Sequence, residues 1–400
     1  MNIVQIGLDV QPESGGTYRT IGNFAAAIRS LGHTANILNC TSAHRPKVDQ
    51  DSVHIPTTTT PLLKSYHYCG AESRAAIAKA LEGCDLIIVH GPYAHAFQLV
   101  ASYARRTATP YAVVLHGGLD PYVFSYRRVR KHLWLRFVGR RFLTEASSVI
   151  CATDAEAVKA LSIHADIRPM VVHWPVQVCP QRVNGDSAAN TIKARLGLRQ
   201  DVRLALFVGR IHPVKRVLEL AKAFTLSAGP LGWALLIVGP PSVAISAKHI
   251  QEVCAESPGC VYVGPKYGEE LAMYYEAAEV LFCLSVKENF GYAVAEACAA
   301  GVPVAVSSGV DLATEICDSG AGWVFHEGED MASFIVRVLS LPKDALRNVG
   351  GLARRWSEAT LSWQRFVEAI AVLVSPWALG RLDVGEPIVR GKGSEEPAWK

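Results

Sequence analysis

Short apolar runs alternate with stretches of helical periodicity along most of this chain. Runs such as 2–7 and 85–90 have the length and the aliphatic content of buried strands. Segments between them, such as 19–31, repeat apolar residues at helical spacing. A chain that alternates strands and helices in this way forms a parallel sheet with helices on both faces. The sequence therefore predicts the α/β class.

The alternation breaks once, at residues 176–190, where Pro180 and a polar Asn-Gly-Asp-Ser stretch interrupt it, and then it restarts. At about 100–200 residues per domain, a chain of this length suggests two domains. We expect two doubly wound, Rossmann-like domains in tandem. The expected divisions are an N-terminal domain at 1–178, a linker at 179–192, a second domain at 193–360, an amphipathic helix at 361–375 and a mobile tail at 376–400.

Composition excludes several classes of protein. Half of the 400 residues are hydrophobic and 19% are charged, which is apolar enough for two cores and excludes a disordered chain. We expect no membrane span and no signal peptide, because no apolar run reaches about 20 residues and residues 1–7 carry no charged leader. The ten cysteines form no Cys-x-x-Cys pair, which disfavours zinc and redox sites. A net charge of +4 is too small to indicate nucleic acid.

Residues 280–301 hold the most specific pattern in the sequence. An apolar run at 280–285 predicts a buried strand, and a helix of small residues starting at Tyr292 is ended by Gly301. Glu288 then lies on the turn between the two elements, and Glu296 lies about one turn inside the helix. Free N–H groups at a helix start near Gly291 suit an anion such as a diphosphate, and carboxylates accept hydrogen bonds from sugar hydroxyls.

The spacing from Glu288 to Glu296, with the strings Lys-Glu-Asn-Phe-Gly and Ala-Gly-Val-Pro-Val around it, resembles the donor-site signature of glycosyltransferase family 4. The resemblance implies the GT-B architecture, in which two Rossmann-like domains face each other across a cleft, and a retaining reaction. It implies that Glu288 contacts the donor sugar and that Glu296 holds the ribose. The residues implied to bind the nucleotide sugar here are Asn289, Phe290, Gly291, Tyr292 and Glu296.

A second motif places two cations directly after the predicted strand at 204–209. Arg210 can hold phosphate oxygens with paired hydrogen bonds, and Lys215 can add a point charge to the same anion. The string resembles the family's Gly-Arg-x-x-x-x-Lys motif, whose cations neutralise the donor diphosphate. Since two cations are in place and no Asp-x-Asp motif suited to a metal occurs, we expect no required metal and no cofactor beyond the nucleotide-sugar substrate.

Two stretches in the first half follow predicted strands and contain glycine. Gly15 and Gly16 allow a backbone to approach a ligand closely, and the family has a glycine-rich loop at this place that meets the donor phosphate. His116 ends the strand at 111–116, and similar family members carry a histidine near the transferred sugar. Asp120 either contacts acceptor hydroxyls or caps the helix that follows.

Residues 127–141 are strongly basic, with apolar residues between the cations. Residues 1–180 as a whole carry 18 Lys and Arg against 12 Asp and Glu. A basic helix of this kind can lie on an anionic membrane, bind the phosphates of a lipid-linked acceptor, or remain solvated. The cations expected to face a membrane are Arg127, Arg128, Arg130 and Lys131.

The resemblance and the basic segment together predict a cytoplasmic enzyme, peripheral at the inner face of the plasma membrane. It would move a hexose from a UDP- or GDP-sugar to a lipid-linked glycan in exopolysaccharide, capsule or lipopolysaccharide synthesis. Two alternatives stay open: an epimerase or phosphorylase on the same fold, and a non-catalytic nucleotide-sugar-binding module. The family often has an Asn-Gly turn after the last strand of the first domain. Trp174 and Pro175 stand there instead, which leaves the hinge undefined.

Overall fold

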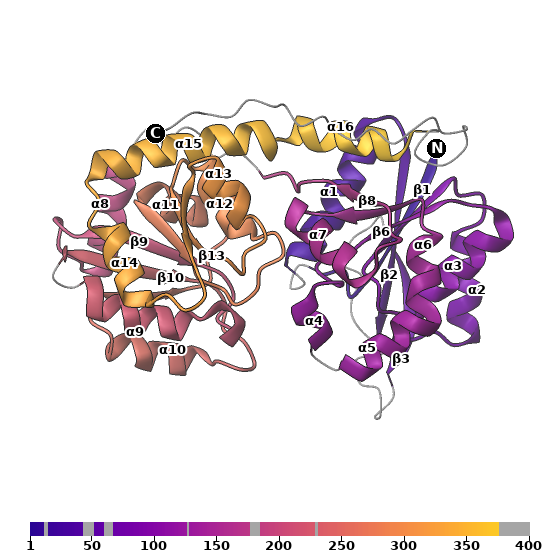
Figure 1. Cartoon of the computed structure of the whole chain (residues 1–400), viewed down its shortest axis with the longest axis horizontal. Helices are drawn as coiled ribbons and strands as arrows, with labels where there is room; N and C mark the ends of the chain where they lie inside the picture. Colours follow the sequence, from indigo (N-terminus) through magenta and orange to yellow (C-terminus); the bar gives the residue numbers. More distant parts are fainter. Residues whose placement is uncertain are drawn as a thin grey trace.

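The computed structural model describes residues 1–11, 15–42, 52–59, 67–125, 128–176, 185–228 and 231–375. They form two α/β domains side by side, each with its own sheet (Figure 1). The predicted fold class and the two doubly wound sheets are confirmed. The predicted tail at 376–400 lies outside the described residues, as do residues 177–184 of the predicted domain connection.

The N-terminal sheet has the order β4-β3-β2-β1-β5-β6-β7-β8. Among the described strands only β4 runs antiparallel to its neighbour. Since β1 lies between β2 and β5, the chain reverses its direction across the sheet beside β1, and ligands of such sheets bind at the carboxyl ends of strands there. The strands are β1 (Asn2–Leu8), β2 (Thr34–Ser42), β3 (Ser52–Thr59), β4 (His67–Tyr68), β5 (Leu86–His90), β6 (Tyr111–Val114), β7 (Ser148–Cys151) and β8 (Pro169–Val171).

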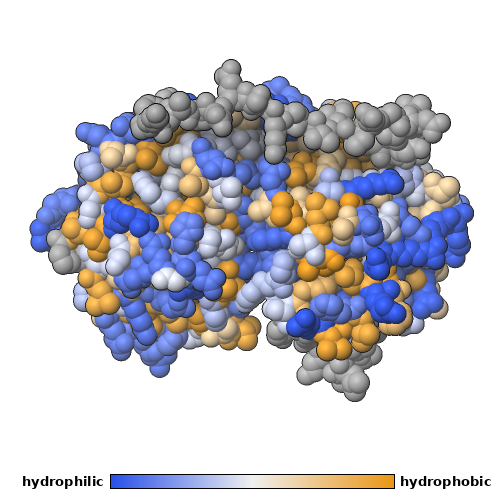
Figure 2. Space-filling view, in the orientation of Figure 1, coloured by the Kyte–Doolittle hydropathy of each residue, from blue (hydrophilic) through white to orange (hydrophobic). Residues whose placement is uncertain are grey.

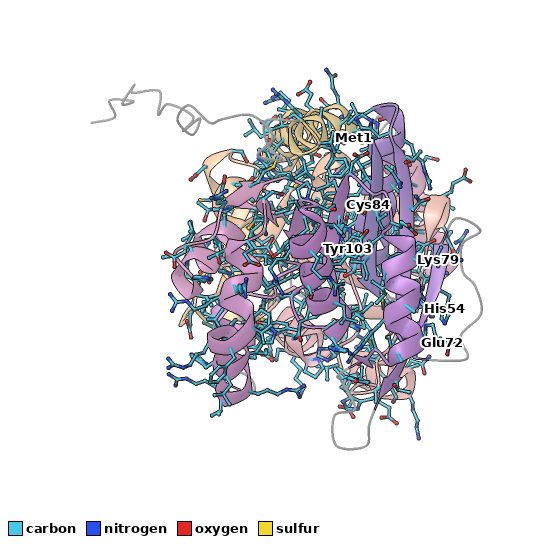
Figure 3. The ribbon with its side chains drawn as sticks, turned by 90° about the vertical axis from the view of Figure 1, so that its right-hand side faces the viewer. Met1, His54, Glu72, Lys79, Cys84 and Tyr103 are labelled. Atoms are coloured by element: carbon cyan, nitrogen blue, oxygen red, sulfur yellow. The ribbon has the colours of Figure 1, made fainter. Side chains whose placement is uncertain are left out.

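Helices cover both faces of this sheet. On the outer side, seen in Figure 3, Tyr103 of α3 donates a hydrogen bond of 2.8 Å to the carbonyl of Leu81 at the end of α2. On the opposite face, Phe24 and Ile28 of α1 are fully buried. The helices are α1 (Gly16–Ser30), α2 (Ala71–Ala80), α3 (His95–Thr107), α4 (Pro121–Ser125), α5 (Arg128–Trp134), the π-helix η3 (Leu135–Gly139), α6 (Arg140–Thr144) and α7 (Asp154–Ile163).

The C-terminal sheet is parallel, with the order β11-β10-β9-β12-β13-β14. Its strands are β9 (Arg203–Val208), β10 (Trp233–Val238), β11 (Cys260–Gly264), β12 (Val280–Cys283), β13 (Val304–Ser307) and β14 (Gly322–Phe325). Its helices are α8 (Gly185–Leu196), the 3₁₀ turn η4 (Pro213–Lys215), α9 (Val217–Ala228), α10 (Ala247–Ala255), α11 (Gly268–Ala277), α12 (Tyr292–Ala299), α13 (Ala313–Asp318), α14 (Met331–Leu339) and α15 (Lys343–Thr360).

The chain crosses between the domains twice, and both crossings lie together. Helix α16 (Trp363–Leu373) follows α15 along one edge of the molecule and packs on α1 of the first domain (Figure 1). Where the second crossing begins, the carbonyl of Leu361 accepts a hydrogen bond of 3.0 Å from the N–H of Val176 on the first. Helix α16 lies inside the segment 361–375, where the sequence predicts an amphipathic helix, and it returns to the N-terminal domain.

Two expectations differ from the structure. The predicted linker at 179–192 is wrong in its second half, because α8 begins at Gly185 and its buried Ile192 packs into the core of the second domain. Its polar, glycine-containing start conceals the helix. The strands β3 and β14 were not expected, because β3 contains Pro56 and a threonine run and β14 has only four residues.

Candidate active site

The carboxyl ends of strands from both sheets meet between the domains, and a notch separates the two domains on the side away from α15 and α16 (Figure 2). Contacts across the boundary join loops that follow β1 and β6 to loops that follow β12. Lys287 Nζ, for example, donates a hydrogen bond of 3.1 Å to the carbonyl of Gly117. The predicted site residues therefore come together at one boundary although they span most of the chain.

Glu288 lies on the turn between β12 and α12, as predicted. Its backbone is fixed by the loop after β13. Its N–H donates to the carbonyl of Gly309 at 2.9 Å, and its carbonyl accepts from the N–H of Asp311 at 2.9 Å. A loop that would otherwise be free to move is thereby tied to a neighbouring strand end, which preorganises the carboxylate.

Lys215 forms an ion pair with Glu288, with both side chains about four-fifths buried. The loop that carries Lys215 is joined to the end of β12 by a 2.8 Å hydrogen bond from the N–H of Val286 to the carbonyl of Val214. Arg210 lies on the same loop directly after β9 and is exposed. The two motifs that the sequence analysis treated separately thus form one unit.

Two helix N-termini face each other across the boundary. Helix α12 starts after Gly291 (φ 77°) and α1 starts after Gly15 (φ 62°), and neither has a side-chain cap or an acidic residue in its first turn. A side chain at Gly16 would stand 3.3 Å from the ring of Tyr292, so the two starts are close neighbours. Their free N–H groups and partial positive charges favour an anion between them.

Glu296 is occupied on both oxygens in this structure. Oε1 pairs with Arg19 of α1 across the boundary, and Oε2 accepts a hydrogen bond of 2.8 Å from the hydroxyl of Tyr275. The guanidinium of Arg19 also lies over the ring of Tyr292, 4.6 Å from its centroid, and the Tyr292 hydroxyl lies 3.0 Å from Thr20 Oγ1. Burial raises the pKa of Tyr292 to about 12, so it stays a neutral hydrogen-bonding group.

His116 follows β6 with a left-handed backbone (φ 50°). Its Nε2 lies 3.1 Å from Nδ1 of His90, and Nε2 of His90 lies 2.9 Å from Oε1 of Gln5. Burial lowers the pKa of His116 to about 4, and burial together with the neighbouring His116 holds the pKa of His90 well below its ordinary value. Both imidazoles are therefore neutral at neutral pH.

The neutral state of His116 predicts a loss of stability in acid. Because the unfolded chain takes up this proton near pH 6.5 and the folded chain only near pH 4, the histidine lowers the free energy of unfolding as the pH falls between these values. The slope is on the order of 1 kcal/mol per pH unit. Urea unfolding from pH 4 to 7 should show this loss for wild type relative to His116→Asn, since asparagine tolerates the same backbone.

Taking the difference between the two proteins cancels the contributions of other titrating groups. The matched control is His249→Gln on α10, whose side chain is 53% exposed. This control should leave the slope unchanged. If the difference in the free energy of unfolding between wild type and His116→Asn did not change with pH, His116 would already carry a proton in the folded protein.

Asp120 belongs to a charged cluster at the boundary. Its Oδ1 accepts a hydrogen bond of 2.7 Å from the N–H of Tyr122, so the capping alternative is correct for α4. Its Oδ2 lies 3.2 Å from Lys159 and 3.4 Å from Lys287 of the other domain. Burial acts to raise the pKa of Asp120, but the two lysines hold it below its usual value. Lys159 also pairs with Asp311 of the C-terminal domain at 2.6 Å. The cluster is therefore a second ion-pair contact between the domains.

The remaining motif residues pack rather than point freely into the cleft. The Asn289 amide lies 3.4 Å from the carboxylate of Glu156, which also accepts from the N–H groups of Gly117 and Ala152 at 2.5 and 2.6 Å. Phe290 is 3% exposed, and its ring lies edge-on to Tyr292 at 5.1 Å. These two residues therefore support the backbone of the turn between β12 and α12, while Glu156 supports the turn after His116.

The basic segment is not one regular helix. After α5 the chain widens into the π-helix η3, where Gly139 leaves room for the ring of Trp134, which packs edge-on against Tyr93 at 4.6 Å. Lys131 also turns inward and donates a hydrogen bond to the carbonyl of Val123, while Arg127 lies outside the described residues. Arg128 and Arg130 are exposed, as predicted.

Beside those cations is an exposed apolar surface, built by some of the apolar residues that the sequence places between them. Val129, Leu133 and Phe137 are 74%, 51% and 72% exposed and follow one another along α5 and η3. Figure 2 shows hydrophobic and hydrophilic atoms next to each other at this end of the N-terminal domain. We call Val129, Leu133 and Phe137 the α5 stripe.

Other predicted absences can be compared only with the part of the chain that the structure describes. No group of three or more His, Cys, Asp or Glu in it is arranged to hold a metal ion. None of its helices is long and apolar enough to cross a membrane. Seven of the nine cysteines in it are buried, in line with the expected core role.

Several residues of the site were not anticipated, and some had a signal. Gln5 is a polar residue in the middle of an apolar strand, His90 ends its strand, and His116 comes two residues after the end of the next. Both features mark buried polar groups that need partners. Arg19 had no such signal, because it is an ordinary surface-type residue of a helix until the domains meet. Tyr275 had none either, because a buried tyrosine of α11 is an ordinary core residue in sequence.

Two protein-family models match the chain, one in each half. The model described as Glycosyltransferase Family 4 matches residues 14–176, and the model described as Glycosyl transferases group 1 matches residues 189–363. Their boundary coincides with the break in the strand–helix alternation and with the crossing between the domains.

Curated relatives and solved structures agree with this. The D-inositol 3-phosphate glycosyltransferase of Geodermatophilus obscurus is 30% identical over 277 residues, which are 66% of this chain and 60% of the relative. The chain thus spans about three-fifths of that relative's length. Sucrose-phosphate synthase from Thermosynechococcus elongatus superimposes with a TM-score of 0.74 at 21% identity, covering 93% of this chain and 98% of the other. Anabaena Alr3699/HepE in complex with UDP-glucose gives a TM-score of 0.70 at 17% identity, covering 94% and 99%. These structures share the GT-B architecture with this chain.

Proposed function

Because this chain belongs to the glycosyltransferases of group 1 and family 4, we propose that it is a retaining glycosyltransferase that moves a hexose from a nucleotide-diphosphate sugar to a glycan acceptor. One arrangement supports this most. The Glu288–Lys215 pair lies beside the start of α12, and the start of α1 stands opposite across the boundary. A carboxylate suited to a sugar hydroxyl and several donors suited to a diphosphate are thereby held in one place.

The leaving diphosphate is the group that these donors serve. Negative charge grows on it as the glycosidic bond breaks, and fixed donors aimed at growing charge are usually the largest part of catalysis. Arg210, Lys215 and the N–H groups after Gly291 supply them from the C-terminal domain, and Gly15 and Gly16 bring the start of α1 to the same anion. In this proposal the cations take the place of a metal ion.

The carboxylates and His116 serve the sugars. Glu288 accepts from a hydroxyl of the transferred hexose, and the neutral imidazole of His116 lies on the opposite side of the boundary. Glu296 holds the ribose of the donor. Since Arg19 pairs with Glu296, a ribose hydroxyl replaces that contact, and the domains separate to admit the donor and close again over it.

The donor can be identified by thermal shift. UDP- and GDP-sugars are the first candidates, because solved GT-B neighbours have UDP or UDP-glucose bound. A ligand present at 100 times its Kd raises the free energy of unfolding by about 2.7 kcal/mol. The sugar nucleotide that gives the largest shift then serves as substrate in the transfer assays below.

Glu288→Gln should remove most transfer activity while binding of the free nucleoside diphosphate survives. The amide keeps the shape of the side chain but loses the charge and one acceptor site, and it frees Lys215 for the diphosphate. Transfer is measured by product formation, and nucleotide binding is measured by calorimetry.

The matched control is Glu315→Gln. Glu315 also pairs across the boundary, with His173 at 2.9 Å, but it lies on α13 away from the donor motif. This variant should retain transfer. If Glu288→Gln lost free-nucleotide affinity and transfer in equal measure, the carboxylate would serve the nucleotide and not the sugar.

For the acceptor we propose a lipid-linked glycan at an anionic membrane. The α5 stripe supplies exposed apolar side chains, and Arg128 and Arg136 beside it supply positive charge. A surface of this composition suits the boundary between headgroups and acyl chains, and each cation contributes about 1 kcal/mol near an anionic surface. Polysaccharide assembly in the cytoplasmic leaflet is the corresponding role.

Vesicle binding tests the membrane assignment. Wild type should sediment with vesicles that contain anionic lipid at low salt, and it should dissociate as salt rises, because the attraction is screened within about 10 Å at 0.1 M. Replacing the α5 stripe with serine should abolish binding even at low salt, since the remaining cations give only weak attraction.

The control replaces Leu226 and Val243 of the other domain with serine, because they are even more exposed than the α5 stripe, at 79% and 110%. That variant should bind like wild type. A wild type that ignores anionic vesicles at low salt would replace the lipid-linked acceptor with a soluble one, and it would leave the donor assignment unaffected.

A further inference from the structure

Three polar side chains run in a line through the apolar core of the N-terminal domain and end at His116. Gln5 is fully buried in the central strand β1, His90 is 4% exposed at the end of β5, and His116 follows β6. We infer that Gln5 and His90 are positioning residues that fix one tautomer of His116, so that its Nδ1 carries a lone pair for a hydroxyl of the transferred sugar. The assignment of the sugar rests on the proposed function, whereas the tautomer does not.

The direction of each hydrogen bond follows from the far end of the line. Gln5 presents Oε1, which can only accept, so Nε2 of His90 must donate across the 2.9 Å contact. A neutral imidazole carries one N–H, and therefore Nδ1 of His90 accepts. Nε2 of His116 must then donate across 3.1 Å, which leaves Nδ1 of His116 without a proton. Within the described residues no protein group bonds to that Nδ1.

Packing holds the line in place. Phe24 of α1 lies edge-on to His90 at 5.5 Å, and the rings of His90 and His116 are nearly parallel at 5.4 Å. The ring of Trp174 lies 6.2 Å from His116 on another side. Because the His116 ring packs between the rings of His90 and Trp174, it cannot flip to exchange its two nitrogens without moving these neighbours. Both its orientation and its tautomer are therefore set by the fold.

The chemical consequence is a fixed acceptor. An imidazole with a bare Nδ1 accepts a hydrogen bond from a sugar hydroxyl, whereas the other tautomer would donate to it. Two acceptors, Nδ1 of His116 and the carboxylate of Glu288, would then face the same hexose from opposite domains. Each requires a hydroxyl on the sugar, and a site that is built to bond a hydroxyl rejects analogues that lack it.

Nitrogen NMR of the protein without substrate tests the tautomer directly. In wild type labelled with ¹⁵N-histidine, we expect His116 to show a protonated Nε2 and an unprotonated Nδ1. Gln5→Leu should give a mixture of the two tautomers. Phe24→Leu, which alters packing against His90 but none of its hydrogen bonds, should keep the single wild-type tautomer.

Kinetics with the donor from the thermal-shift screen test the role. Gln5→Leu should lower kcat about tenfold, the effect of one hydrogen bond, with little change in KM. In a series of monodeoxy donors, one should react about tenfold more slowly with wild type and show no further loss with Gln5→Leu.

A protonated Nδ1 in wild type would overturn the inference, as would a Gln5→Leu protein that keeps the wild-type tautomer. If NMR shows the expected tautomers but no sugar is transferred, the hydrogen-bonded line from Gln5 to His116 is supported and the proposed function is contradicted.

Discussion

Replacing Arg210 or Lys215 with alanine should lower kcat with the nucleotide-sugar donor by about 10²–10³, which corresponds to about 3–4 kcal/mol of transition-state stabilisation. Lys215 is largely buried beside Glu288, and Arg210 stands exposed at the start of the same loop. Both cations would meet one leaving diphosphate, so the double variant should lose much less than the product of the two single losses. Single-turnover rates at saturating donor are the measurement.

Arg216→Ala is the matched control, because it removes a cation from the same loop. Arg216 pairs with Glu219 at 2.7 Å and lies over the ring of Phe325, so its guanidinium is already engaged within its own domain. Its kcat should stay within about twofold of wild type. If Arg210→Ala or Lys215→Ala kept a near-wild-type rate, the assignment of that cation to the leaving diphosphate would be contradicted. Chelator should leave all rates unchanged, and a strict requirement for Mg²⁺ or Mn²⁺ would show that the cations do not suffice.

The parts of the site that could be predicted are those that one stretch of chain makes by itself. Glu288, Gly291 and Glu296 lie within nine consecutive residues, and a strand, a turn and a helix start fix their mutual positions wherever that stretch is placed in a fold. The same holds for Arg210 and Lys215 after β9. Sequence reasoning therefore located both motifs and their element boundaries.

The parts that could not be predicted depend on how two separately folded domains meet. Arg19 reaches Glu296, and Lys287 reaches Asp120, across long separations in sequence. No local pattern distinguishes such an arginine or lysine from a solvated one. The basic segment departs from the expected regular helix for a different reason. The π-helix shifts the register of the basic segment, which turns Trp134 inward and leaves Phe137 outward.

The hinge is the point at which the structure adds most to the sequence. Trp174 replaces the flexible turn that the family often has, and it is 2% exposed. Its ring contacts Phe24 of the N-terminal domain at 5.6 Å, Phe366 of α16 at 6.5 Å and Phe290 of the donor motif at 6.4 Å. One apolar cluster therefore runs from α1 through the crossing into the second domain. The packed ring of Trp174 thus ties the crossing to both domains.

Trp174→Ala should consequently be strongly destabilising. Truncating a buried tryptophan removes its contacts and leaves a cavity, at a cost of about 3–5 kcal/mol in the free energy of unfolding. Because the ring serves both domains, their unfolding transitions should also separate in a calorimetric scan, whereas the wild-type transitions should be coupled. Trp174→Phe keeps an aromatic ring at this position and should cost less.

Trp363→Ala provides the comparison, since Trp363 also contacts Phe366, at 5.7 Å, but is 42% exposed. A partly exposed side chain leaves little cavity behind, so this variant should lose about 1 kcal/mol or less. Urea unfolding of the three variants measures the difference. If Trp174→Ala lost no more stability than Trp363→Ala, the crossing would be held by its backbone hydrogen bond between Val176 and Leu361 and not by the packed ring.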